Sequence, residues 1–180
     1  LSPITNALTE LSAGVFERDP GGNPGVRLLE SSVNILKPIP GMLYEDKALE
    51  IQGRTMADLE GGIGVGAAVR NVAHLVDTHF GQAKKCAPWA HNASFDVGFL
   101  DAACERWKLA YPFNHVHRCS MMLFRALQDA GRHECYRANL DAVCAHYGID
   151  IPEAERHTAI GDLTATAWAI DLMLRDVGTP

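Results

Sequence analysis

The sequence predicts an α/β fold in which a mixed β-sheet is flanked by helices. Near the N-terminus, two segments alternate apolar and polar residues with period two, which is typical of strands with one buried face. Further along the chain, apolar residues recur at spacings of three and four, and short strands alternate with helices. A length of 180 residues suits one domain, predicted to span 1–180 with a flexible tail over 177–180.

The first two strands are predicted over residues 7–16 and 28–37. Between them, "DPGGNPG" is dense in turn-forming residues, so the two strands should form a hairpin with a loose loop. Period-two alternation gives the expected apolar sides, which consist of Leu11, Ala13, Val15, Val33 and Ile35.

The remaining elements follow from periodicity and capping signals. Helices are predicted over 44–51, 66–80, 95–107, 120–129, from the N-cap Asn139 to Tyr147, and over 159–176, with strands over 86–90 and 113–117. The glycine-rich "GGIGVG" over 61–66 has no strand before it, which favours a lead into a helix over a phosphate-binding loop. The expected inward-facing residues of three helices are Val69, Val72, Val76 and Phe80; Phe95, Phe99, Ala103 and Trp107; and Leu163, Ala167, Ile170 and Leu174.

Composition limits the possible functions. A net charge of −6 argues against a protein that coats long nucleic acids, but it allows a site that grips a strand end with the help of metal ions. The five cysteines form no CxxC pair, which indicates reduced thiols and a cytoplasmic location. No apolar run approaches the roughly 18 residues that span a bilayer, so no membrane contact is expected.

One carboxylate occupies an unusual position. In "WAHNASFDVGFL", Asp96 lies within a run of apolar and small residues, where a charge needs a partner or a metal. The best candidate to lie beside it is Asp162 in "RHTAIGDLTATAWAI". His157, five residues earlier, would point about 140° away on a continuous helix. It could converge with Asp162 if it lies in a loop and Thr158 caps the helix.

These two segments resemble a known family. "AHNASFDVGFL" is similar to the second motif, and "HTAIGDLTAT" to the third motif, of the DEDDh (DnaQ-like) 3′-to-5′ exonucleases. "TNALTELSAGVF" resembles the family's second strand and "LEIQGRT" its substrate-contacting segment. The likeness is strongest to the ribonuclease T branch. The resemblance implies a ribonuclease H-like sheet and a hydrolase that removes nucleotides from DNA or RNA ends.

The resemblance also implies roles for individual residues. Asp96 and Asp162 would hold two divalent ions, Mg²⁺ or Mn²⁺, and His157 would be the general base. Carboxylate oxygens suit such hard cations, and an imidazole is an effective base near neutral pH. Substrate-binding residues implied in the same way are Asn92, Phe95, Gln52 and Gly53. The implied partners are single-stranded 3′ ends, with a possible homodimer.

The sequence departs from the family at its first motif. The Asp-x-Glu pair is absent, and "LSPITNALTE" aligns just after it. We therefore expect the domain to be N-terminally incomplete and to lack the central strand of its sheet. The alternative is a catalytically inactive relative that binds nucleic acid or a protein partner, and a small-molecule phosphohydrolase could use the same carboxylates. The sequence leaves the choice between DNA and RNA open.

Overall fold

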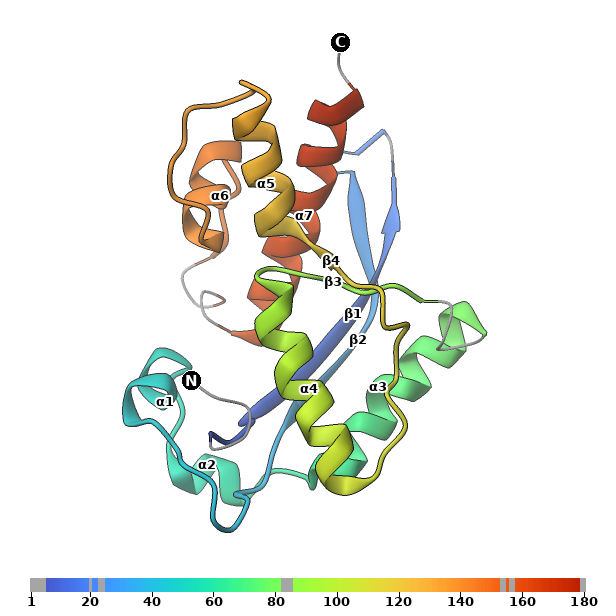
Figure 1. The fold of residues 1–180 in the computed structure, drawn as a ribbon, viewed down its shortest axis with the longest axis vertical. Helices are drawn as coiled ribbons and strands as arrows, with labels where there is room; N and C mark the ends of the chain where they lie inside the picture. Colours follow the sequence, from blue (N-terminus) through green and yellow to red (C-terminus); the bar gives the residue numbers. More distant parts are fainter. Residues whose placement is uncertain are drawn as a thin grey trace.

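The computed structural model describes the chain except residues 1–5, 20, 23–24, 82–85, 153–154, 156–157 and 179–180. A long hairpin crosses the molecule (Figure 1). One group of helices gathers near the C-terminal end of the last helix, and a second group lies toward the other end of the hairpin. This arrangement confirms the predicted mixed α/β fold.

Strand β1 (Glu10–Arg18) and strand β2 (Val26–Ile35) form the antiparallel hairpin, as predicted. The apolar side expected for β2 is wrong, because Val33 is exposed and its neighbour Asn34 is buried. The Asn34 amide donates to the Leu11 carbonyl, and its oxygen accepts from the Asn71 amide. A buried polar side chain is tolerated when it is hydrogen-bonded in this way.

The other two strands are much shorter than predicted. Strand β3 (Trp89–Ala90) pairs in parallel with strand β4 (Arg118–Cys119). The strand expected over 113–117 is irregular, and its apolar residue Val116 is exposed. The alternation of apolar and polar residues over 113–117 therefore does not correspond to a strand with one buried face.

The two pairs of strands form separate sheets. Hydrogen bonds join β1 only to β2 and β3 only to β4. Among the strands that the structure describes, none pairs with the second edge of β1, although this strand is nine residues long. The single mixed sheet that was predicted is thus two separate two-stranded sheets in the described part of the chain.

Seven helices are present in the described residues, and six of them were predicted. They are α1 (Asp46–Ile51), α2 (Met56–Glu60), α3 (Val65–Phe80), α4 (Ala93–Trp107), α5 (Ser120–Asp129), α6 (Leu140–Tyr147) and α7 (Ala159–Gly178). The unpredicted α2 begins with a reciprocal cap in which Thr55 and Asp58 bond each other's backbone N–H groups. Gly148 ends α6 in a left-handed conformation, as expected of a C′ glycine.

Helix ends account for most errors in the predicted buried faces. Val69, Val72 and Val76 are buried in α3, but Phe80 at its last position is exposed. In α4 the middle of the predicted stripe is buried, whereas Phe95 and Trp107 are 44% and 37% exposed. A periodic stripe predicts burial only where another element covers it.

The buried face of α7 is also displaced from the prediction. The expected inward residues Leu163, Ala167, Ile170 and Leu174 are half-buried. The buried residues include Gly161, Ala165, Ala169 and Met173, spaced four apart, together with Asp171. Small side chains on this face let α7 lie close to the elements around it.

The hydrophobic core has two parts. The first joins β2, α3 and α4 through Leu36, Val65, Ala68, Val69, Leu100, Ala103 and Cys104. The second joins α5, α6 and α7 through Phe124, Leu127, Ala138, Val143, Ala169 and Met173. No helix within the described ranges is long and apolar enough to cross a membrane.

Candidate active site

The turn between β3 and α4 presents the second predicted motif. Asn92 adopts a left-handed conformation with φ of 59°, which asparagine tolerates better than most residues. Its carbonyl accepts the backbone N–H of Phe95 at 2.9 Å, so the helix begins immediately after it. This sharp entry places Asp96 in the first turns of α4, on the side where the chain arrives from the sheet.

Asp96 has an unusual electrostatic environment. The residue is exposed, although neighbouring protein atoms partly desolvate its carboxyl group. This desolvation raises the pKa of Asp96 to about 6, and a bond from its own backbone N–H opposes the rise. No other described residue forms an ion pair or a hydrogen bond with the carboxyl. Asp96 thus has a carboxylate for which the described residues provide no charge partner.

Phe95 directly precedes Asp96 in the chain, and part of its ring is exposed. Its centroid is 4.8 Å from that of Phe99, with the rings tilted by 44°. One aromatic neighbour holds the ring while 44% of the residue remains accessible. The predicted core position was wrong, and an exposed ring is what the alternative of base stacking requires.

His91 links the turn between β3 and α4 to helix α5, a role that the sequence did not reveal. Its Nδ1 lies 2.9 Å from the hydroxyl of Ser120, which is fully buried at the start of α5. Its Nε2 is enclosed and has no hydrogen-bond partner among the described residues. Burial lowers the pKa of His91, opposed by the backbone of Ala138. The neutral ring ties the end of β3 to α5 and so fixes the start of α4.

The N-terminus of α7 presents the third predicted motif. Thr158 caps this helix, as predicted, because its hydroxyl accepts the Gly161 N–H at 3.1 Å and donates to the Glu155 carbonyl at 2.7 Å. Asp162 is exposed one turn later, and its backbone N–H bonds the Thr158 carbonyl. His157 lies outside the described residues.

Gly161 allows the preceding loop to fold back on α7. A Cβ atom at this position would lie 2.0 Å from the carbonyl oxygen of Glu155. Only glycine fits this close backbone approach. The loop before Asp162 is therefore shaped by a requirement that the sequence did not reveal.

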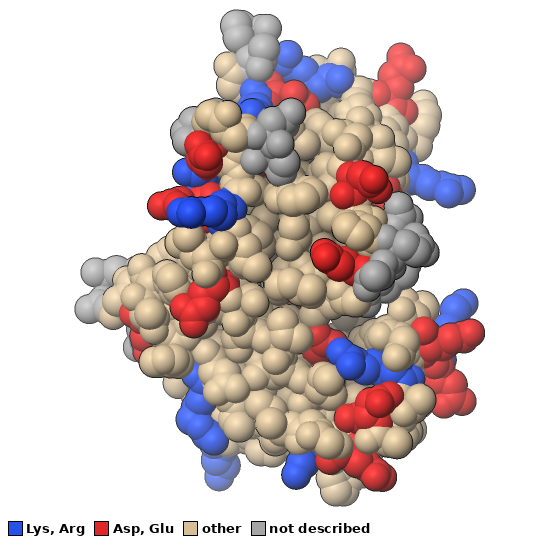
Figure 2. Space-filling view, turned by 180° about the vertical axis from the view of Figure 1, so that it is seen from behind, with Lys and Arg blue, Asp and Glu red and all other residues tan. Residues whose placement is uncertain are grey.

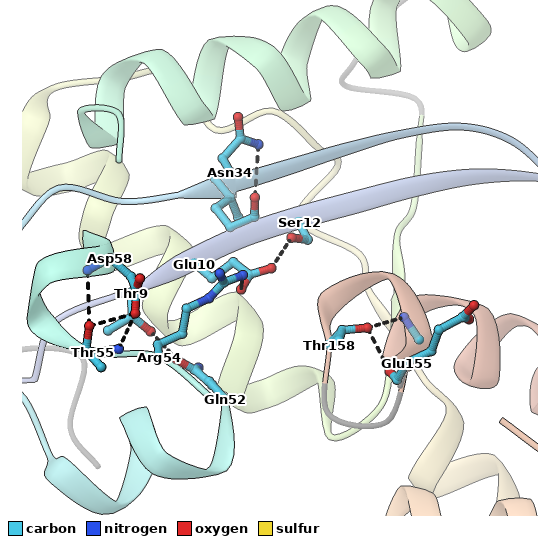
Figure 3. A network of polar contacts seen from close by, with 12 residues as sticks. Thr9, Glu10, Ser12, Asn34, Gln52, Arg54, Thr55, Asp58, Glu155 and Thr158 are labelled. Carbon is cyan, nitrogen blue, oxygen red and sulfur yellow. Dashed lines mark hydrogen bonds and ion pairs between the residues drawn. The ribbon is translucent and has the colours of Figure 1, made fainter. Parts of the chain in front are cut away.

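The α1–α2 turn carries the predicted substrate-contacting residues Gln52 and Gly53. The Thr9 hydroxyl donates to the Gln52 side-chain oxygen at 3.0 Å, and Arg54 pairs with Glu10 at 3.4 Å. Figure 3 shows these side chains joining the turn to the start of β1, with Thr158 and Glu155 beyond Ser12. Thr9, just before β1, and Glu10, the first residue of β1, thus hold the turn in place.

Helix α4 packs against β3 and β4, and helix α7 packs against β1 and β2. Within the described ranges, no group of three His, Cys, Asp or Glu side chains is arranged to hold a metal ion. On the face drawn in Figure 2, acidic and basic side chains are interspersed and form no continuous basic stripe. This face therefore lacks the pattern of proteins that coat nucleic acid.

Solved structures with this architecture define the class of protein. A full-length 3′-exonuclease superposes with a TM-score of 0.72 at 15% identity, covering 94% of this chain and 53% of that one. The nuclease domain of 3′hExo, a DEDDh family member bound to rAMP, gives 0.66 at 14% identity, covering 96% and 94%. The fold is that of the ribonuclease H-like DEDDh exonucleases.

Sequence comparison then gives the family. The RNase T family model, described as an exonuclease, matches residues 40–169, and the chain belongs to this family. It is 27% identical over 169 residues to ribonuclease T of Vibrio parahaemolyticus, covering 91% of this chain and 75% of the relative. It is 25% identical over 173 residues to ribonuclease T of Shewanella putrefaciens, covering 91% and 71%. The predicted exonuclease relationship and the 3′-to-5′ hydrolase class are confirmed.

Proposed function

We propose that the chain provides a metal-dependent site that hydrolyses phosphodiester bonds at the 3′ ends of single-stranded DNA or RNA. The observation that carries this proposal is the carboxyl of Asp96 at the start of α4, whose pKa is raised to about 6 and which directly follows the exposed Phe95. A divalent cation would relieve the cost of that charge, and carboxylate oxygens are suitable ligands. Asp162 would supply the second carboxylate, and both acids lie in the first turns of their helices.

The remaining residues of the site have separate tasks in this proposal. His157 takes a proton from the attacking water, Phe95 stacks on the terminal base, and Asn92, Gln52 and Gly53 line the pocket. Bound divalent ions would stabilise the attacking and leaving oxygens at phosphorus. Homodimerisation and a cytoplasmic location stay predictions.

The proposal needs more oxygen ligands than Asp96 and Asp162 provide. Mg²⁺ requires near-octahedral geometry and loses water reluctantly, so two carboxylates should hold one ion weakly at most. An extended segment with an Asp-x-Glu pair could supply the others by pairing with the open edge of β1. That edge runs past the turn held by Thr9 and Glu10.

A non-cleaving binding domain is the second candidate. It is favoured by the lack of a three-ligand group within the described ranges. The two candidates share a nucleic-acid surface but differ in whether phosphodiester bonds are broken.

Trimming of 5′-labelled single-stranded oligonucleotides distinguishes the candidates. With Mg²⁺ or Mn²⁺, we expect little cleavage by the 180-residue chain. A chain extended by a strand with Asp-x-Glu should give a ladder shortened from the 3′ end. In the extended chain, His157→Ala should slow cleavage by about a hundredfold, and Asp162→Asn should abolish it, while the exposed-site control Asp129→Asn should not. Persistent cleavage in Asp162→Asn would falsify the proposed site.

A further inference from the structure

Arg54 immediately follows the turn that carries Gln52 and Gly53. Gly53 has φ of 62°, and the Arg54 N–H bonds the Leu49 carbonyl at 2.9 Å, so the chain reverses sharply after α1. The reversal directs the Arg54 side chain toward the start of β1 (Figure 3). A guanidinium is therefore fixed beside two residues that the proposed function assigns to substrate binding.

The ion pair of Arg54 is loose and uses little of its hydrogen-bonding capacity. One Arg54 nitrogen lies 3.4 Å from Glu10, whose other oxygen accepts the Ser12 hydroxyl. A guanidinium has five N–H donors. Because 30% of the Arg54 side chain is exposed, further donors can reach a ligand from solvent.

A second arginine–glutamate pair, which lies within the β1–β2 hairpin, provides a contrast. Arg27 and Glu17 approach to 2.6 Å, with side chains that are 71% and 55% exposed. The Glu10 side chain is only 13% exposed, so its pair with Arg54 is less solvated. The nitrogen–oxygen distance of this pair, 3.4 Å, is also longer. A phosphate offers the guanidinium two oxygens with a better geometric match than this single long contact.

We propose that Arg54 is a phosphate-binding residue that contacts the backbone of a single strand whose 3′ end lies at the Gln52–Gly53 turn. The inference rests on the proposed function. With this role, Arg54 provides an acidic chain with a positively charged side chain at the point where the nucleic-acid backbone must enter. Glu10 then holds the guanidinium in place until a phosphate replaces the carboxylate.

Binding without cleavage tests this inference. The full chain is titrated against a short fluorescein-labelled single strand in EDTA, with fluorescence anisotropy measured at several salt concentrations. Arg54→Ala should weaken binding about tenfold, as expected when a charge-assisted hydrogen bond is lost. The slope of log affinity against log salt should fall by about 0.7. The control Arg27→Ala should bind like the wild type.

Glu10→Gln separates phosphate binding from a structural role. Releasing Arg54 from its carboxylate should tighten binding if Arg54 contacts phosphate. If the pair only holds the turn, Glu10→Gln and Arg54→Ala should weaken binding alike, and the inference is overturned. If Arg54→Ala does not fold, comparison of Glu10→Gln with the double variant isolates the arginine.

The remaining outcomes separate this inference from the proposed function. Wild-type binding that Arg54→Ala leaves unchanged overturns the role of Arg54 alone. A wild-type chain that does not bind the strand at all overturns the proposed nucleic-acid site, and the role of Arg54 with it.

Discussion

Asp96 on α4 is exposed and Asp171 on α7 is buried, and the two carboxylates lie in opposite electrostatic settings. Asp171 on α7 is 2% exposed, and it accepts Arg18 at 3.2 Å, Arg175 at 2.8 Å and the Gly25 N–H at 3.1 Å. Asp96 has no such partners in the described part of the chain. A buried charge with several partners fastens elements together, whereas a crowded charge without them is a position for a ligand.

Removing the paired carboxylate should have the largest effect on stability. Asp171→Ala removes the carboxylate that accepts Arg18, Arg175 and the Gly25 N–H, which should lower the free energy of unfolding by about 2–4 kcal/mol. Urea unfolding measures this loss. The exposed Asp129→Asn should change stability by less than about 0.5 kcal/mol. Equal effects from the two variants would contradict the fastening role of Asp171.

The approach at Gly161 tests how tightly the loop beside the proposed site is held. Gly161→Ala should destabilise the fold by about 1–3 kcal/mol, because the new methyl group meets the Glu155 carbonyl. Gly66→Ala is the matched control inside α3, where the nearest atom is the end of the flexible Arg70 side chain at 3.4 Å. That change should stabilise the chain by about 0.5–1 kcal/mol. Thermal unfolding distinguishes the two signs.

Neutralising Asp96, which has no charge partner among the described residues, should stabilise the chain, whereas removing the Asp171 carboxylate should destabilise it. The folded state raises the pKa of Asp96 to about 6, so it favours the protonated form. This contribution is fully present below about pH 4 and is lost as the pH rises through 6. Asp96→Asn should therefore gain about 1 kcal/mol at pH 7, allowing for solvent contact, and nothing at pH 4.

The same stability comparison in the presence of a divalent cation tests whether the Asp96 carboxylate binds metal. Mn²⁺ should stabilise the wild type at pH 7. The difference in free energy of unfolding between the wild type and Asp96→Asn should then become smaller. A destabilised Asp96→Asn at pH 7 would show that the carboxylate has a partner that we have not identified.

The smallest effect is expected at His146, where the folded state favours loss of charge. Burial lowers its pKa, His133 lowers it further, and Asp176 opposes both. Stability from the neutral ring is therefore complete above about pH 6.5 and is lost as the pH falls below that value. His146→Gln should reduce this acid sensitivity, measured by urea unfolding between pH 5 and pH 7. An NMR titration that gave His146 an ordinary pKa would contradict the assignment.

Local signals in the sequence predicted much of the fold and the site. Period-two alternation identified the hairpin, and the spacing around Thr158 identified the cap of α7. The exposure of Phe95 was not predicted, because a helical stripe contains no information about whether another element covers it. The Asp171 cluster was also not predicted, since its partners are separated by up to 153 residues along the chain. The glycine requirement at residue 161 depends on a backbone contact that leaves no periodic signal.

The Asp171 cluster also has a consequence for the order in which the protein is made. Its contacts join Arg18 and Gly25 to Asp171 on α7, which is synthesised 153 and 146 residues later. Until α7 is synthesised, the hairpin cannot complete these long-range contacts, and its apolar surface stays accessible. We therefore expect nascent chains that stop before α7 to bind chaperones and to be cut readily by proteases, whereas chains that include α7 become resistant.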